Sequence, residues 1–353
     1  MDVERFDYWN KKTYVSFLLS ALVVLIHNSG IAQYVIQIDA DEGKNIAVFF
    51  NNLFSETIAR VAVPLFFVIS GATFFRNYDR TKYKEKIQRR IKSLLIPYFL
   101  WNVISMMFDI FCAYTPIHYF FVGRKPFIVS FQNVIEALFL YKCNGVFWFV
   151  YSLIVFTVLS PIINVIITRK WTSFCLLLAS LFIPYYASAL FLRLKLDPNS
   201  IFFYVLGCVI GKYCFKWFSE MSAKRDSIIS VLLCFVCVAF QMLNIYEVLI
   251  IPIVCHQLLL VLFCYSFWKA IDLFVVKVKL REYMKNSFFV YAMHMNVQAI
   301  IVKVIYLVGP KVIWMAYPNF IVSFLVTMFI ILFVSSLTKE HLPRIYSALS
   351  GNR

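Results

Sequence analysis

The stretch that decides the fold is YVSFLLSALVVLIH, residues 14–27. It is an uninterrupted apolar run that ends in an ionisable side chain, His27. Because about 20 apolar residues in a helix span a bilayer, the run predicts a first membrane helix. An ionisable group inside the hydrocarbon costs at least about 2.5 kcal/mol, so His27 marks a functional site by default.

The composition extends this reading to the whole chain. Of the 353 residues 62% are hydrophobic and 15% are charged, and the mean hydropathy is +0.78. These values exclude a soluble protein and predict an all-α, polytopic transmembrane bundle, which is a single integral-membrane domain over residues 1–353. About ten spans fit the apolar runs. They are expected near 13–31, 54–75, 93–115, 146–168, 171–190, 200–218, 226–245, 247–268, 287–308 and 317–337.

Charge sets the expected orientation. The net charge is +16, but 25 of the 34 Lys and Arg residues fall in the segments that lie on one side of these spans. This is the positive-inside pattern, so we expect both termini to be cytoplasmic and the partner of the basic surface to be membrane lipid, not nucleic acid. Two further segments, 126–142 and 271–280, are expected to lie at the outer and inner surfaces; Lys277 and Lys279 belong to the second.

Counting helical rise places several polar groups at one depth. His27 is roughly 22 Å above the inner boundary, and Arg60 is about 9 Å below the outer one. Lys303, Trp148 and Tyr151 are expected near the same level, which predicts an internal cavity close to the outer face. The alternatives are that Lys303 reaches the surface and that Trp148 belongs to the interfacial aromatic belt.

The same counting separates the other histidines from His27. His294 is expected about 10 Å above the inner boundary and His256 near the midplane, so no direct contact with His27 is predicted. Glu56 and Arg60 stand four residues apart on one helix. Their pairing either neutralises Arg60 or contributes to substrate binding.

The loop 76–92 contains eight bases and two acids, a net charge of +6. It either sets topology and attracts anionic lipid or binds the phosphates of a cytoplasmic, nucleotide-bearing donor.

Five motifs in this order resemble the integral-membrane acyltransferase family 3. They are VLIH (24–27), RVAVPLFFVISG (60–71), RRIKSLLIPY (89–98), FWFVYSL (147–153) and YAMH (291–294). The resemblance implies transfer of an acyl group, most often acetyl, from cytoplasmic acyl-CoA to a sugar hydroxyl of a cell-surface polysaccharide or its lipid-linked precursor. It also implies a bacterial inner membrane as the location.

The resemblance maps the family's essential histidine onto His27 and its basic motif onto Arg89 and Lys92. In one respect the chain departs from the family, which usually has an Arg eleven positions before the histidine in an Asp-x-x-Arg context. Ser16 and Thr13 occupy those positions here. Either Lys11, Lys12 or the loop 76–92 replaces that Arg, or the chain does without it.

The expected reaction uses neutral His27 as general base, either by direct transfer or through an acyl-histidine. Donors to the oxyanion are sought among Arg60, Asn28, Ser70 and Trp148. No metal is implied. The expected catalytic residues are His27, Arg60 and Asn28, the substrate-binding residues Glu56, Ser70, Trp148, Tyr151 and Lys303, and the acyl-CoA-binding residues Arg89, Arg90, Lys92 and His294.

The rival interpretation is a non-enzymatic transporter or flippase of a glycan or small solute that uses His27 and Arg60 as a coupling site. Such a protein would work without CoA. The sequence leaves the oligomeric state open, a homo-oligomer included.

Overall fold

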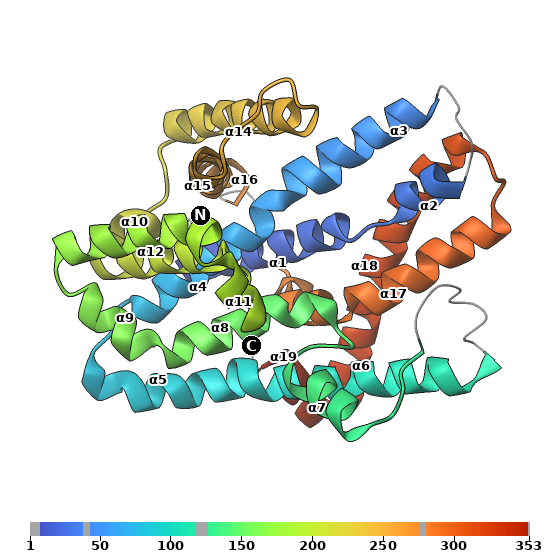
Figure 1. The fold of residues 1–353 in the computed structure, drawn as a ribbon, viewed down its shortest axis with the longest axis horizontal. Coiled ribbons are helices and arrows are strands. Elements are labelled where there is room, and N and C mark those ends of the chain that lie inside the picture. The colour runs from blue at the N-terminus through green and yellow to red at the C-terminus, as the bar shows by residue number, and fades with distance from the viewer. Residues whose placement is uncertain (1–7, 38–42, 117–125, 276–279, 352–353) are drawn as a thin grey trace, which may run out of the picture.

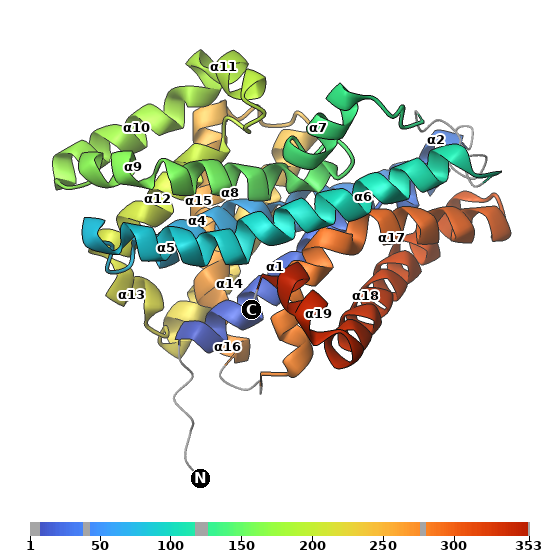
Figure 2. The same ribbon diagram turned by 90° about the horizontal axis from the view of Figure 1, so that it is seen from below.

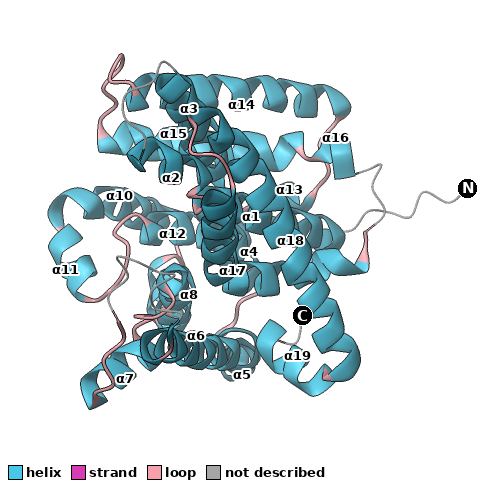
Figure 3. Ribbon diagram, turned by 90° about the vertical axis from the view of Figure 1, so that its right-hand side faces the viewer, coloured by secondary structure: helices cyan, strands magenta, loops and turns pink. Residues whose placement is uncertain are grey.

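The computed structural model describes residues 8–37, 43–116, 126–275 and 280–351. The regular secondary structure of these residues is helical (Figure 1). No strand occurs in these ranges. Seen along the bundle, α1 (Tyr8–Ile26) and α17 (Ser287–Val308) lie near its centre with other helices on every side (Figure 3). The all-α bundle predicted from the apolar runs is therefore confirmed.

The remaining helices are the following: α2 (Gly30–Gln37), α3 (Gly43–Asn51), α4 (Ala62–Phe75), α5 (Tyr83–Arg90), α6 (Ile96–Tyr114), α7 (Phe131–Phe139), α8 (Trp148–Val158), α9 (Ser160–Ile166), α10 (Lys170–Tyr186), α11 (Ser188–Arg193), α12 (Ser200–Tyr213), α13 (Phe215–Ser219), α14 (Lys224–Ile245), α15 (Ile253–Ala270), α16 (Asp272–Val275), α18 (Ala316–His341) and α19 (Pro343–Ser350). Two π-helical segments, Asn52–Ile58 and Ile91–Leu95, interrupt the helical rods that end in α4 and begin with α5.

Seven helical segments of the described chain are long and apolar enough to cross a membrane. They correspond to seven of the ten expected spans. An eighth, expected at 146–168, is a pair of helices, Gly145–Val158 and Ser160–Ile166, bent by 60°. The other two, 171–190 and 200–218, contain α10 with 17 residues and α12 with 14, which are shorter than the roughly 20 residues that a span needs.

The short helix α12 packs tightly on α4. A Cβ built on Gly207 would overlap the Val68 carbonyl, one on Gly211 would overlap Ala72, and one on Gly71 would overlap the carbonyl of Tyr204. Glycine at these positions lets two helix backbones approach directly, as small residues four apart do in membrane helices. This contact fixes α4, and through it the motif 60–71, against the core of the bundle.

A buried ion pair joins the start of α1 to α16. Nζ of Lys11 lies 2.6 Å from Oδ1 of Asp272, with the side chains 0% and 1% exposed. The same ammonium lies 4.2 Å from the centre of the Trp268 ring, and Oδ2 of Asp272 accepts a hydrogen bond from the amide of Ser222. Lys11 is thus part of the scaffold.

The expected surface segment 126–142 contains the nine-residue helix α7 and no span. Ser130 caps α7 by accepting a hydrogen bond from the amide of Asn133. Tyr98 and Asn102 on α6 donate to the last carbonyls of α7, those of Phe139 and Leu138. In the second expected surface segment, Lys277 and Lys279 lie outside the described residues.

Candidate functional site

His27 and His294 meet at the centre of the bundle. Nδ1 of His27 lies 3.4 Å from Nε2 of His294, and the ring centroids are 5.1 Å apart. His294 is fully buried, whereas His27 is half-buried. The expectation that the two histidines lie at different depths is therefore wrong.

The register between α1 and α17 explains the error. The rings of Phe17 and Tyr283 are in contact, with centroids 5.4 Å apart. His27 follows Phe17 by ten residues and His294 follows Tyr283 by eleven, so the two histidines rise to the same level. The depth estimate failed because it placed the start of both helices at one inner boundary. In the structure, α1 starts nine residues before its Phe17–Tyr283 contact, whereas α17 starts four residues after it.

Hydrogen bonds assign the tautomers of this pair. Nδ1 of His294 lies 2.7 Å from the Tyr291 carbonyl, so it carries the proton and leaves Nε2 as an acceptor. Nδ1 of His27 lies 2.9 Å from the Val23 carbonyl and faces that acceptor, so it too carries a proton. Nε2 of His27 is then the unprotonated nitrogen, and it has no partner in the described structure. The geometry prepares this nitrogen to accept a proton.

An inner cavity of about 500 Å³ leads toward the pair. On α1 it is lined by Trp9, Thr13, Ser16 and Ser20. These residues share one helix face with His27, because Trp9 and His27 are separated by about five turns of 3.6 residues. On α17 the cavity reaches Tyr291, one turn before His294. The two histidines thus continue the two walls of the cavity.

Basic residues line the rim of the inner cavity, which is the end away from the histidine pair. Among its described lining residues, Lys12, Arg89, Arg90 and Lys285 carry positive charge. Arg89 is paired with Glu85 and Lys285 with Glu282, which offsets part of that charge. Lys92 is exposed and is absent from the described lining.

Ser16 and Thr13, which stand where the resemblance leads one to expect Arg and Asp, both line the inner cavity. Of the two lysines considered as replacements for that Arg, Lys11 is engaged by Asp272 and Lys12 lines the cavity. The position of Lys12 favours it over Lys11.

A second, outer cavity of about 530 Å³ lies on the other half of the bundle. The helical rod Tyr83–Tyr114 shows this, since its Arg89–Leu94 part lines the inner cavity and Asp109 lines the outer one. The turn Gly145–Phe147 separates the two cavities. Gly145 lines the outer cavity, while the carbonyl of Val146 accepts a hydrogen bond from Tyr291 at the end of the inner one.

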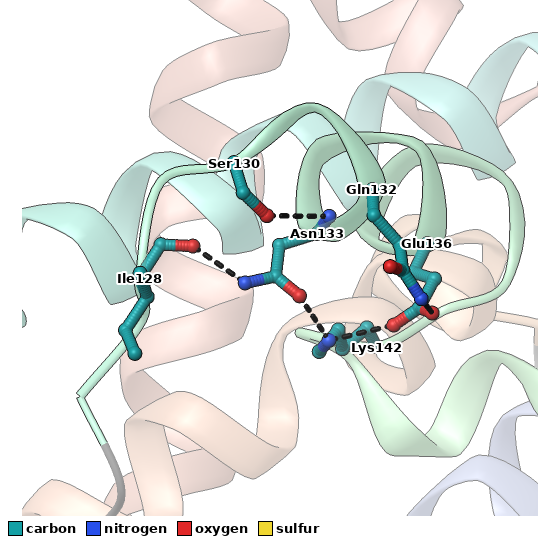
Figure 4. Close-up of polar contacts among 6 residues, drawn as sticks. All are labelled: Ile128, Ser130, Gln132, Asn133, Glu136 and Lys142. Atoms are coloured by element: carbon teal, nitrogen blue, oxygen red, sulfur yellow. Dashed lines mark hydrogen bonds and ion pairs between the residues drawn. The ribbon is translucent and has the colours of Figure 1, made fainter.

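Lys142 organises the wall of the outer cavity (Figure 4). Its ammonium donates at 2.6 Å to Oδ1 of Asn133 and at 2.6 Å to Oε2 of Glu136. The amide of Gln132 donates to the same carboxylate. The hydrogen bonds from Lys142 and then Gln132 hold the pKa of Glu136 below its ordinary value, so the pair is charged at neutral pH.

Arg60 and Ser70, which were both predicted near the reacting centre, lie at different depths along one helical rod. Ser55 donates to the carbonyl of Leu25, two residues before His27, so the turn around Ser55 in the helical rod Gly43–Phe75 is about level with His27. Arg60 lies five residues further along that rod, paired with Glu56 as expected from their spacing.

Ser70 is far from His27. The hydroxyls of Tyr8 and Thr73 share a hydrogen bond, which makes this end of α4 level with the start of α1. Ser70 therefore lines the inner cavity near its basic rim. Its predicted role at the reacting centre does not fit this position.

Asn28 has a structural role. Its amide donates to the carbonyl of Phe320, and its Oδ1 accepts from the amide of Gly30 and the hydroxyl of Ser323. These bonds join the end of α1 to α2 and α18, and they use one of the two N–H groups of the Asn28 amide.

None of His27, Arg60, Lys303, Trp148 and Tyr151 lines either of the two cavities just described. Trp148 packs on Phe67, and Tyr151 on Tyr141.

Three residues that the sequence analysis did not select stand close to His294 on α17. Tyr291 lines the inner cavity and Asn296 the outer one. Gln298 is buried one turn beyond His294, and neither polar atom of its side chain has a partner in the described structure. Polar residues within an apolar run of α17 were the available signal.

Among the described residues, no group of three or more His, Cys, Asp or Glu side chains could hold a metal ion.

Comparison with known proteins identifies the family. A family model described as "Acyltransferase domain" matches residues 15–338 of the 353. No curated protein and no solved structure matches the chain. The match includes both histidines and every described residue on the walls of the inner cavity from Ser16 to Tyr291. The chain therefore belongs to the integral-membrane acyltransferase family 3 and is a multi-pass membrane acyltransferase.

Proposed function

We propose that the protein is an O-acyltransferase of the bacterial cytoplasmic membrane. It moves an acyl group, in the first instance acetyl, from cytoplasmic acyl-CoA to a sugar hydroxyl of a cell-surface glycan or its lipid-linked precursor. The observation that carries the proposal is the histidine pair on α1 and α17, two helices whose preceding turns line a cavity with a basic rim.

The inner cavity suits acyl-CoA as the donor. The phosphates of CoA are polyanionic and would stay at the rim with Lys12, Arg89, Arg90 and Lys285. The uncharged pantetheine arm would enter the cavity past the hydroxyls of Ser16 and Ser20. This path brings the thioester toward Tyr291, about 4.5 Å along α17 from His294.

The chemistry follows from the tautomers. Nε2 of His27 removes the proton of the acceptor hydroxyl while that oxygen attacks the thioester carbon. His294 and the Val23 carbonyl hold Nδ1–H of His27 and so orient the ring. The tetrahedral intermediate collapses by breaking the C–S bond. The CoA sulfur takes the proton from His27, which gives CoA thiol and the new ester.

Arg60 is the group that we assign to the oxyanion. Glu56 accepts from two of its nitrogens, which leaves further N–H groups of the guanidinium for a developing negative charge.

Release of CoA thiol by purified protein in proteoliposomes tests this function. With acetyl-CoA outside and a polysaccharide acceptor inside, thiol release that requires both the acceptor and His27 is expected. Acceptor movement across the bilayer without CoA, lost in His27→Ala, would instead support a transporter that uses His27 as a coupling site.

A further inference from the structure

The outer cavity contains polar groups that the protein itself does not satisfy. Asn296 makes no hydrogen bond in the described structure, although its carboxamide can both donate and accept. Asn144 is 4% exposed, and its amide is held by the hydroxyl of Ser105 at 3.1 Å and the carbonyl of Ala292 at 3.3 Å. Its Oδ1 has no partner. A buried polar group left unpaired in this way calls for an explanation.

Lys142 adds a donor to the same wall. Two of the three N–H groups of its ammonium are used by Asn133 and Glu136, which leaves one (Figure 4). The outer cavity also has apolar surface, which is provided by Pro126, Phe127, Ile128 and Met295. Unpaired donors and acceptors beside apolar patches match a sugar ring, which has hydroxyls at its edge and C–H groups on its faces.

We infer that the outer cavity binds a neutral saccharide unit, with Asn296 and Lys142 as its hydroxyl-binding residues and Asn144 as a buried support of the same wall. The inference rests on the proposed function, for which this saccharide is the acyl acceptor.

The charge pattern selects a neutral ligand. Lys142 is the one cation among the described lining residues, Glu136 already offsets its charge, and Asp109 adds an acidic side chain to the same lining. An acidic sugar would gain little from a lysine that is paired in this way. A neutral glycan needs no counter-charge.

Position supports the same assignment. Asn296 lies only about 3 Å beyond His294 along the axis of α17, on the opposite face of that helix, and the turn Gly145–Phe147 forms the boundary with the inner cavity. Two substrates that enter from opposite halves of the bundle would therefore approach the histidine pair from either side of one turn. The outer cavity differs from the substrate-binding site predicted from the sequence. None of the residues predicted for that site lines this cavity: Glu56, Ser70, Trp148, Tyr151 and Lys303.

Saturation-transfer NMR on the full chain in nanodiscs tests the inference without acyl-CoA. The probes are the methyl glycosides of glucose, galactose and N-acetylglucosamine, with methyl glucuronide as the acidic comparison. We expect at least one neutral glycoside to bind, and Asn296→Leu to weaken it about tenfold, as the loss of hydrogen bonds to a ligand predicts. Lys142→Met should weaken it as well. Lys195→Met is the matched control, because that side chain is exposed and outside both described cavities.

His27→Ala separates this inference from the proposed function. It should abolish acyl transfer and leave glycoside binding unchanged. Binding that Asn296→Leu leaves intact, tighter binding of the glucuronide, or no binding of any neutral glycoside would overturn the saccharide site. Binding of the glycoside without transfer from acetyl-CoA in the wild type would overturn the proposed function instead. Comparison with a glycosyl diacylglycerol in the nanodisc distinguishes a lipid-linked saccharide from a water-soluble one.

Discussion

The orientation of the His27 ring depends on two acceptors, the Val23 carbonyl and Nε2 of His294. His27 could be identified from the sequence, because an ionisable residue in an apolar run stands out. Its contact with His294 could not, since it depends on the offset between two helices. That offset is set by packing such as that of Phe17 on Tyr283, which no residue count along one helix contains.

Replacing His294 tests this contact at the residue scale. His294→Ala removes one acceptor of the His27 Nδ1–H, a bond worth about 1.4 kcal/mol, so kcat should fall about tenfold. The KM for acyl-CoA should not change. His294→Gln, whose Oε1 can accept the same proton, should recover most of the activity. A raised KM with unchanged kcat would return His294 to the donor-binding role predicted from the sequence.

At the scale of elements, the long apolar helices were predictable and the interrupted ones were not. The bend between α8 and α9 and the shortness of α12 depend on tertiary packing, such as the seam that Gly207 and Gly211 form with α4. The inner cavity could not be predicted from the sequence either, because its wall combines one face of α1 with residues from α4, α5 and α17. Its basic component, Arg89 and Arg90, was expected from the charge of the loop 76–92.

The glycine seam makes a prediction about stability. Gly207→Ala places a methyl group against the Val68 carbonyl, so α4 and α12 must separate, at a cost of about 1–3 kcal/mol. Gly145→Ala is the matched control, because a Cβ there meets no atom within 4 Å. Unfolding in detergent, followed by circular dichroism, should show a lower Tm for the first variant only. Equal Tm values would mean that the seam is looser than described.

The rim of the inner cavity makes a second prediction at this scale. Lys12→Ala and Arg90→Ala should each weaken acyl-CoA binding, and more so at low salt, because both residues line the cavity. Lys92→Ala should have little effect, since Lys92 is exposed outside the described lining. Titration calorimetry at two ionic strengths measures this. A loss confined to Lys92→Ala would transfer the donor site to the surface of the loop.

In the whole molecule, the N-terminal end of α1 is held by α16 through the Lys11–Asp272 pair, while its other end carries His27 (Figure 2 shows α1 and α16 side by side). The sequence predicted the class of the fold and, from the bias in Lys and Arg, an orientation with both termini in the cytoplasm. A buried pair between residues about 260 positions apart was not predictable, because charge counting treats Lys11 as one more basic residue at the inner surface.

Breaking this pair should destabilise the whole chain. Asp272→Asn leaves Lys11 buried without its counter-charge, which costs about 3 kcal/mol, although Asn can still accept from the Ser222 amide. The double variant Lys11→Met with Asp272→Asn should recover most of that loss. Unfolding by SDS, followed by tryptophan fluorescence, compares the three proteins. A single variant as stable as the wild type would contradict the buried pair.

The central claim is acyl transfer at His27, and mass spectrometry of surface glycans tests it most directly. Three strains are compared, which carry the wild-type gene, a deletion and His27→Ala. We predict that the glycan of the wild type carries an acyl group, acetyl in the first instance, that both other strains lack, with the variant protein present in the membrane at normal level. Identical glycans in all three strains would contradict the account.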